Sequence, residues 1–363
     1  MIYSSLRALV QNRDVRWMAG RLLRSPHRAG KFANVLKVQW AKMRRDYGAR
    51  STMPLIVSVE PTNSCNMKCP MCPTGLGVLT RRKGMMDLER FAGLVRQLER
   101  TTLIMTFWGW GESTLNPQLY DLIRIAHDRG IFTMLTINGT SIDAERILDC
   151  GLDYLVVSFD GLREESYRPV RIGGDLQAAK AGVGRLAARK RERGLARPRI
   201  NMGFIVTRLN EPELPGLDEQ ARAIGFDATR PKYLHVVTRQ VAEQLRPLSE
   251  VLRGQVGIVG PGRTIEPSIP GIVRPPAPNG CGLLWEYAMV YWDGTMVPCC
   301  YDWDAEQPLG NAFTTPFAEV WRGEVYREFR RRVTNDKQSI PLCRECQGGD
   351  IQVFFSDTFL LNR

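Results

Sequence analysis

The sequence has no uninterrupted apolar run near the roughly 20 residues that a helix needs to span a bilayer. Its N-terminus also lacks the apolar core of a secretory signal, because Arg7, Arg13 and Arg16 interrupt it. Histidine is scarce, with three residues in 363, which disfavours a histidine-based zinc site. Without an export signal, we expect the protein to stay in the reducing environment of the cytoplasm.

Cysteine, in contrast, occurs nine times, which in such a chain favours metal ligation over disulfides. Three of the nine, Cys65, Cys69 and Cys72, have the spacing C-x3-C-x2-C directly after an apolar run. Three thiolates on one short loop can hold three irons of a cubane iron–sulfur cluster and leave the fourth iron open for a ligand. A zinc knuckle is the alternative, although no histidine lies nearby.

The net charge of +12 is concentrated in residues 1–50, which hold twelve Lys and Arg against Asp14 and Asp46. Apolar periodicity predicts two or three helices there, and one helix face carries Phe32, Val35, Leu36, Trp40 and Met43. We expect residues 1–54 to form a basic helical extension that packs as a collar on the rest of the protein. The alternative is peripheral contact with an anionic membrane or an acidic partner. No nucleic-acid-binding motif accompanies the charge, so we expect no nucleic-acid partner.

From residue 55 onward, strand and helix patterns alternate, which predicts an α/β fold with a parallel sheet and right-handed crossovers. The predicted strands are Leu55–Val59, Leu103–Trp108, Ile131–Ile137, Tyr154–Phe159, Ile200–Val206 and a segment within Thr229–Val237. The predicted helices between them include Leu88–Arg100, Leu119–Arg129, Asp143–Cys150, Leu176–Arg193 and Glu211–Ile224. We therefore expect one domain over residues 55–253, then a Pro/Gly-rich linker over residues 254–280.

Polar motifs follow two of these strands. The second strand leads into Trp108-Gly109-Trp110-Gly111-Glu112, where the glycines would let the backbone approach a ligand and Glu112 adds an acceptor. The fourth strand ends at Ser158, and Arg171 follows in the next loop. An arginine suits carboxylate binding because its planar guanidinium forms two hydrogen bonds at once. A strand-end turn or a surface arginine remains the structural alternative.

A second cysteine region spans residues 281–350 and precedes a tail at 351–363. Asp293-Gly294 lies between two short β-rich runs and predicts a hairpin that brings Cys281 and Cys299 to the same end. A predicted helical segment, Pro316–Val333, then leads to Cys343 and Cys346. Four thiolates can ligate every iron of a cluster, and a zinc ribbon is the alternative.

Two cysteines fall outside both sets. Cys150 lies at a predicted helix end and is expected to be buried and inert. Cys300 is adjacent to Cys299, so its side chain should point the other way if the strand continues. It is a packed thiol, the true ligand in place of Cys299, or a hydrogen donor to a substrate.

With these motifs the chain resembles the radical S-adenosylmethionine (SAM) superfamily, and residues 281–350 resemble its SPASM/Twitch extension, specifically the shorter Twitch form with one auxiliary cluster. The resemblance implies a partial (β/α)6 TIM-like barrel, two [4Fe–4S] clusters and SAM bound at the open iron of the first. Gly109, Gly111 and Glu112 resemble the family's Gly-Gly-Glu motif, although Trp110 and Ser113 depart from it. Ser158 and Arg171 resemble residues that contact the ribose or carboxylate of SAM.

The resemblance further implies an oxidoreductase that takes an electron from flavodoxin or ferredoxin, cleaves SAM to a 5′-deoxyadenosyl radical and removes hydrogen from a substrate C–H bond. We expect a two-electron oxidation of a small polar metabolite such as a sugar or cyclitol, similar to the aminoglycoside alcohol dehydrogenases. The alternatives are an epimerase with Cys300 as hydrogen donor, a peptide maturase, an enzyme acting on a lipid or lipid-linked sugar, and a non-catalytic zinc or iron–sulfur sensor.

Overall fold

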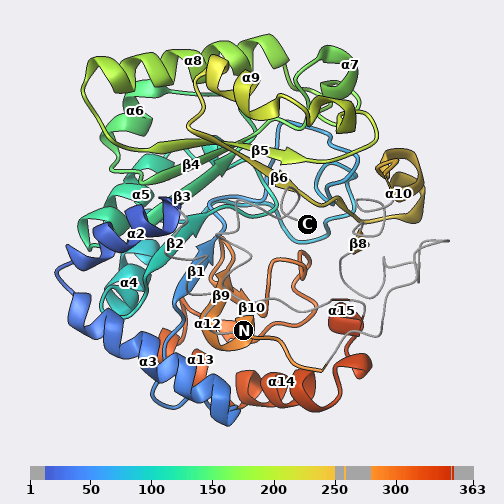
Figure 1. Ribbon diagram of the computed structural model, residues 1–363. Helices are drawn as coiled ribbons and strands as arrows, with labels where there is room; N and C mark the ends of the chain where they lie inside the picture. Colours follow the sequence, from blue (N-terminus) through green and yellow to red (C-terminus); the bar gives the residue numbers. More distant parts are fainter. Residues whose placement is uncertain (1–12, 250–256, 259–278, 345, 347–363) are drawn as a thin grey trace.

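The computed structural model describes residues 13–249, 257–258, 279–344 and 346 (Figure 1). Its centre is a parallel sheet in which six strands lie in the order of the sequence. These strands are β1 (Ile56–Val59), β2 (Ile104–Phe107), β3 (Phe132–Ile137), β4 (Tyr154–Ser158), β5 (Arg199–Ile205) and β6 (Ala228–Lys232). The sheet does not close on itself, because β6 pairs within it only with β5 among the described residues. The predicted partial (β/α)6 barrel is therefore confirmed.

Helices cover the outer face of this sheet, as Figure 1 shows. They are α4 (Leu88–Leu98), α5 (Leu119–Asp128), α6 (Ala144–Asp149), α7 (Glu164–Tyr167), α8 (Leu176–Glu192) and α9 (Leu217–Ile224). Asp87, Asp143 and Asp175 each cap a helix by accepting a hydrogen bond from a first-turn amide. The helix predicted over residues 211–224 is instead a short 3-10 turn, Glu211–Glu213, followed by α9. The two are separated at Gly216, which adopts a positive φ of 82°.

The C-terminal cysteine region joins the same sheet. Strand β9 (Tyr287–Val290) pairs in parallel with β1, and β10 (Thr295–Val297) pairs antiparallel with β9 through the predicted Asp293-Gly294 turn. The predicted hairpin is confirmed, and β11 (Gly310–Asn311) extends it. The remaining elements of this region are α12 (Leu283–Glu286), α13 (Phe317–Arg322), α14 (Glu324–Asn335), the 3-10 turn Lys337–Ser339 and α15 (Pro341–Arg344). The single helical segment predicted for residues 316–333 is thus two helices, separated at Gly323.

Part of the predicted linker is structured. Strand β8 (Gly257–Ile258) pairs in parallel with β7 (His235–Val236), which precedes α10 (Arg239–Leu245). The prediction of an unpacked linker is therefore wrong for these two residues. Residues 254–256 and 259–278 of the predicted linker lie outside the described residues, and so does the predicted tail at 351–363.

The basic extension packs against the amino-terminal ends of the strands through α2 (Arg13–Leu23) and α3 (Arg28–Arg44). Arg21 pairs with the buried Asp153 at 3.3 Å, directly before β4. Lys31 is buried and donates to the carbonyls of Thr102 and Gly130 at 2.7 and 2.9 Å. Burial lowers the pKa of Lys31 to about 7. The described part of the extension thus packs against the sheet as the predicted collar would.

None of the described helices is both long enough and apolar enough to cross a membrane. None of the nine cysteines forms a disulfide. Disulfides therefore contribute nothing to this fold.

Candidate active site

The C-x3-C-x2-C loop follows β1 at the carboxyl ends of the parallel strands, where barrel enzymes place their chemistry. Cys69 is buried, and Cys65 and Cys72 are partly exposed. The loop folds back on itself, because the amide of Cys72 donates to the carbonyl of Cys69 at 3.1 Å. The amide of Met67 donates to the sulfur of Cys65 at 3.4 Å. Such N–H···S contacts are one of the means by which a protein tunes an iron–sulfur cluster.

The three thiols lie close enough to act on one another electrostatically. Burial is the main cause that raises the pKa of Cys69 to about 11; Arg171 opposes the shift, and the thiols of Cys72 and Cys65 contribute to it. No three His, Cys, Asp or Glu side chains in the described ranges converge on a point that suits a single metal ion. A cubane does not need such convergence, because each thiolate binds a different iron. The donor set therefore fits a cluster with three protein ligands.

The structure also gathers the four cysteines of the C-terminal region. Cys281 precedes α12, Cys299 follows β10, and Cys343 and Cys346 lie in and after α15. The pKa of Cys343 is raised to about 12, mainly by burial and in part by the nearby thiols of Cys346 and Cys281. Cys299 is likewise influenced by Cys343 and Cys346. The predicted set is thus brought together, with four thiolates for one further cluster.

The glycines after β2 are required by contacts within the protein. A β-carbon on Gly109 would lie 2.6 Å from the side-chain Cγ of Glu60, and one on Gly111 would lie 2.3 Å from the carbonyl oxygen of Thr62. Both distances are too short for any other residue type unless the neighbouring atoms move. The motif after β2 therefore packs directly against the chain that leads into the cysteine loop.

Glu112 connects three strand ends. Its backbone amide donates to the carbonyl of Ser64 at 2.8 Å. Its buried carboxylate accepts hydrogen bonds from the amide and hydroxyl of Thr114 at 3.1 and 2.7 Å, and from the amide of Asn138, after β3, at 2.7 Å. Burial raises the pKa of Glu112, and the hydrogen bonds from Thr114 and Asn138 oppose the shift. The side chain thus joins the turn after β2 to the end of β3, and the backbone amide joins this turn to the chain that enters the cysteine loop.

Ser158 and Arg171 lie at the same end of the sheet. Ser158 is partly exposed as the last residue of β4. Arg171 is largely buried and forms an ion pair with Asp160, whose other oxygen accepts a hydrogen bond from the amide of Ile205 at 2.6 Å. The Nε of Arg171 has no hydrogen-bond partner among the described residues. Its loop contacts the cysteine loop directly, because the Lys68 amide donates to the carbonyl of the residue after Arg171 at 2.8 Å.

Two connections between the barrel and the C-terminal region were missed in the sequence. Arg81 donates two hydrogen bonds to the fully buried Glu60, at 2.9 and 2.8 Å, and one to the carbonyl of Trp303. The indole of Trp110 donates to the carbonyl of Cys300 at 2.8 Å. The departure of Trp110 from the glycine pattern was the one available signal. In this chain the tryptophan connects the barrel mouth to Cys300, the residue directly after Cys299 of the second cysteine set.

Lys232, the last residue of β6, was also missed, because the sixth strand was the least regular in sequence. Its side chain is open to solvent at the barrel mouth, where the charges of Asp160, Arg171 and Cys300 all act on it. The surrounding protein, which removes part of its hydration, and the neighbouring Arg230 lower the pKa of Lys232 to about 8. The strand therefore presents a cation to the same space as Asp160 and Arg171.

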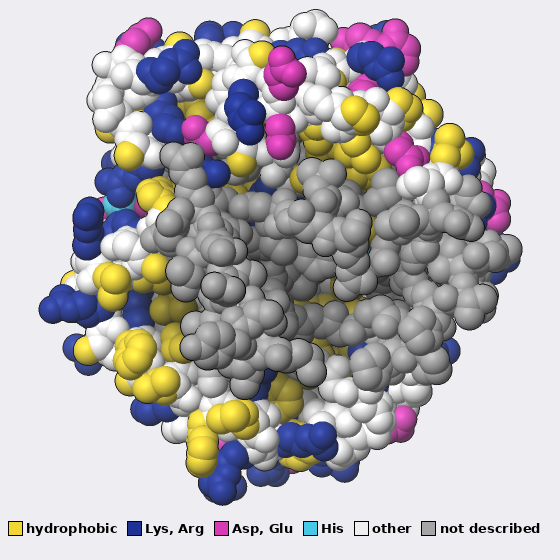
Figure 2. All heavy atoms as spheres, viewed as in Figure 1, with side chains coloured by type: hydrophobic (Ala, Val, Ile, Leu, Met, Phe, Trp, Pro, Cys, Tyr) yellow, Lys and Arg dark blue, Asp and Glu magenta, His cyan; other side chains and the backbone are white. Residues whose placement is uncertain are grey.

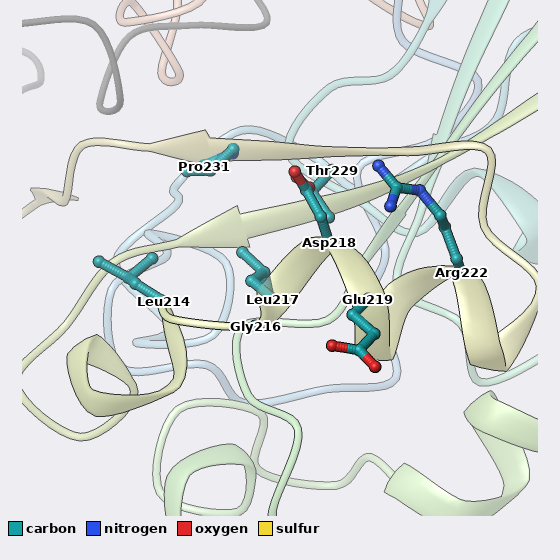
Figure 3. A pocket seen from close by; sticks show the side chains of 8 residues that line it. All are labelled: Leu214, Gly216, Leu217, Asp218, Glu219, Arg222, Thr229 and Pro231. Carbon is teal, nitrogen blue, oxygen red and sulfur yellow. The ribbon is translucent and has the colours of Figure 1, made fainter.

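A surface pocket lies elsewhere, on the outer side of the sheet between α9 and β6 (Figure 3). Asp218 points toward β6, where its carboxylate accepts a hydrogen bond from the hydroxyl of Thr229, and Glu219 points away from the strand. The lining contains no cysteine and no residue of the motifs described above. We therefore assign this pocket no part in the site.

Two family models match the chain, the radical SAM superfamily over residues 59–211 and an iron–sulfur cluster-binding SPASM domain over residues 281–347. The chain is 26% identical over 335 residues to the tungsten-containing aldehyde ferredoxin oxidoreductase cofactor-modifying protein of Pyrococcus furiosus. That similarity covers 83% of this chain and 89% of the relative. The chain is also 27% identical to the PqqA peptide cyclase of Gluconobacter oxydans. That similarity covers 47% of each protein, so the chain spans about half the length of this relative.

Among solved structures, BtrN in complex with AdoMet and 2-DOIA matches with a TM-score of 0.50 and 15% identity, covering 83% of this chain and 96% of BtrN. Streptococcus suis SuiB bound to its precursor peptide SuiA matches with a TM-score of 0.58 and 17% identity, covering 85% of this chain and 74% of SuiB. At such identities the similarity establishes the fold. With the two family models, the fold and the two cysteine sets, the chain belongs to the radical SAM superfamily, whose cofactors are SAM and [4Fe–4S] clusters, and carries a C-terminal SPASM/Twitch-type domain.

Proposed function

We propose that this protein is a radical SAM oxidoreductase that removes two electrons from a small polar metabolite. The observation that carries the proposal is the contact between Trp110 and the carbonyl of Cys300, which holds the residue next to the ligand Cys299 against the barrel mouth. A two-electron oxidation needs an acceptor for the electron that remains after hydrogen abstraction. A cluster ligated by Cys281, Cys299, Cys343 and Cys346 is suited to that task, because no iron is left open for substrate.

The residues divide into ligands and positioning groups. Cys65, Cys69 and Cys72 would hold the first cluster, which together with SAM supplies the 5′-deoxyadenosyl radical. The backbone of Gly109–Glu112, with Ser158 and Arg171, would line the SAM site. Arg171 is already paired with Asp160, so we propose that it meets SAM through its remaining N–H groups and that Asp160 sets its orientation.

The electron would come from flavodoxin or ferredoxin, as in similar enzymes. We place the protein in the cytoplasm, because cysteines without disulfides and iron–sulfur clusters persist in a reducing compartment. No motif in the sequence favours nucleic acid as substrate. The named activity of the P. furiosus relative, cofactor modification, is consistent with a small-molecule substrate, whereas SuiB was solved with a bound precursor peptide.

Lys232 narrows the substrate class. A solvent-accessible cation at the rim of the barrel mouth favours a substrate that carries a phosphate or carboxylate near the reacting carbon. Sugars and cyclitols that carry such a group would match the positive charge of Lys232 and belong to the small polar metabolites proposed as substrates.

The substrate class is testable with a panel of sugar and cyclitol phosphates and their uncharged parents. Anionic members should stimulate 5′-deoxyadenosine formation, and Lys232→Gln should raise KM for them roughly tenfold or more, since a charge-assisted hydrogen bond is worth about 1.5–3 kcal/mol. Because Lys232 is charged below its pKa of about 8, KM in the wild-type enzyme should rise as the pH increases through 8. Lys232→Arg should retain binding and lose this rise. Equal stimulation by the uncharged parents would contradict the assignment.

Epimerisation is the second candidate, and the position of Cys300 favours it. Its carbonyl is held by Trp110, and the charge of Lys232, in the barrel mouth, acts on its thiol. Burial raises the pKa of Cys300 to about 12, so the thiol keeps its hydrogen at neutral pH, as a hydrogen-atom donor must.

The substitution Cys300→Ser in D2O separates the two reactions. For an oxidation, the variant should form product at a near-normal rate, with an oxidised carbon and no solvent deuterium at that position. For an epimerisation, the wild-type product should contain one deuterium, and the variant should make 5′-deoxyadenosine but little product. Deuterium in the wild-type product, lost in Cys300→Ser, would overturn the proposed oxidation. Cys150→Ser, which alters a buried thiol at the end of α6, is the matched control.

A further inference from the structure

The outer face of α3 exposes a row of large apolar side chains. Phe32, Leu36, Trp40 and Met43 are 66%, 57%, 57% and 72% exposed, and they follow one another at spacings of three or four residues. Such a row occupies a single stripe along a helix. Scattered apolar residues on a surface are ordinary, but a continuous stripe indicates an interaction surface.

The stripe lies opposite the face that attaches α3 to the barrel. The buried residues of the helix are Lys31, Asn34, Val38 and Ala41. At about 100° per residue, the centres of the two sets are separated by about 180° around the helix axis. The collar packing therefore uses one side of α3 and leaves the apolar stripe directed into solvent.

Positive charge borders the stripe on both sides. Arg28 lies along one side, and Lys37 and Arg44 lie along the other, and all three are exposed. The guanidinium of Arg44 lies 4.8 Å from the ring centroid of Trp40. No Asp or Glu occurs between Arg24 and Arg45. Figure 2 shows the result along the lower left edge, where α3 runs in Figure 1: apolar side chains alternate with basic ones.

We infer that this face of α3 docks the protein onto an anionic phospholipid membrane. Apolar side chains would enter the boundary between headgroups and acyl chains, Trp40 would lie at the interface, and the flanking cations would contact lipid phosphates. A second copy of the chain fits less well. A two-fold contact between stripes would bring Arg28, Lys37 and Arg44 against the same cations of the partner, with no acidic residue on α3 to compensate.

Docking through α3 leaves the barrel mouth free. Lys31 and Asn34 attach the helix to the chain that precedes β1, β2 and β3, whereas the cysteine loop follows β1 at the other end of the strand. A water-soluble substrate would therefore reach the site of a membrane-bound enzyme. The inference is independent of the proposed reaction.

The test is flotation of the reconstituted full-length protein with phosphatidylcholine vesicles that contain or lack phosphatidylglycerol. We expect binding only to the anionic vesicles, and weaker binding at high salt. The triple variant Phe32→Ser, Leu36→Ser and Trp40→Ser should lower the partition coefficient at least tenfold. Val325→Ser with Leu248→Ser, which removes exposed apolar side chains elsewhere, should not. Lys37→Glu with Arg44→Glu should also weaken binding, and Arg185→Glu with Arg191→Glu on α8, which changes the charge by the same amount, is its control.

A second measurement places Trp40 in the bilayer. Lipids brominated in the acyl chains should quench tryptophan fluorescence on binding, and Trp40→Phe should bind yet lose most of that quenching. Absence of binding to anionic vesicles would overturn the inference. So would a concentration-dependent dimer, observed without lipid, that the triple serine variant disperses, because the stripe would then be a contact between two copies.

Discussion

Replacing Cys65, Cys69 and Cys72 together with alanine is expected to abolish SAM cleavage while about half of the iron remains. Two cubanes hold about eight irons, so the variant should retain roughly four, bound by the other cysteine set. The physical reason is that only the first loop leaves an iron without a protein ligand. The measurement is iron and sulfide content after anaerobic reconstitution, together with 5′-deoxyadenosine formed from SAM and dithionite.

The complementary variant Cys343→Ala with Cys346→Ala should also retain roughly four irons, yet it should still cleave SAM. Substrate oxidation should fail in it, because the second electron has no acceptor. Cys150→Ala controls for the loss of a thiol as such and should keep both clusters, since Cys150 is fully buried and its thiol donates to the carbonyl of Ile147 in its own helix. A wild-type protein that takes up zinc and shows no iron-dependent absorbance would refute the assignment of both sites.

Glu60→Ala is expected to destabilise the protein by about 3–5 kcal/mol, because it leaves the guanidinium of Arg81 without its carboxylate in a largely buried position. Arg81 also holds the carbonyl of Trp303 and lies 3.7 Å from the ring centroid of Tyr291, so its displacement would loosen the contact between barrel and C-terminal region. We expect the melting temperature of the reconstituted protein to fall by roughly 5–10 °C.

The double variant Glu60→Gln with Arg81→Met should recover part of this loss, since it leaves no unpaired buried charge. Glu145→Ala, which removes the partner of arginines on and after α8, is the matched control and should leave the melting temperature nearly unchanged. If Glu60→Ala alters stability no more than Glu145→Ala, then Arg81 does not depend on its carboxylate partner. A Glu60→Ala protein that cleaves SAM without oxidising substrate would locate the effect at the contact with the C-terminal region.

Several elements of the fold were predictable because their causes are local. Alternating strand and helix patterns specify a parallel sheet, and the ends of β1 to β5 lie close to their predicted bounds. The Asp293-Gly294 turn specified the β9–β10 hairpin for the same reason. The pairing of β9 with β1 was not predictable, because the edge of a strand carries no signal for its partner. The paired residues, such as Val59 and Val290, lie far apart in the sequence.

The sequence by itself determined the family, the two cysteine sets and the glycine motif, because ligand spacing and backbone freedom are properties of short segments. Only the tertiary structure decided how these parts meet. Arg81 and Trp303 are 222 positions apart, and Trp110 and Cys300 are 190 apart. Periodicity and charge showed α3 to be amphipathic and basic, but which of its faces packs on the barrel depends on the buried contacts of Lys31 and Asn34. Which face of α3 is buried depends on contacts made across the whole chain, and the apolar pattern of the helix alone does not specify it.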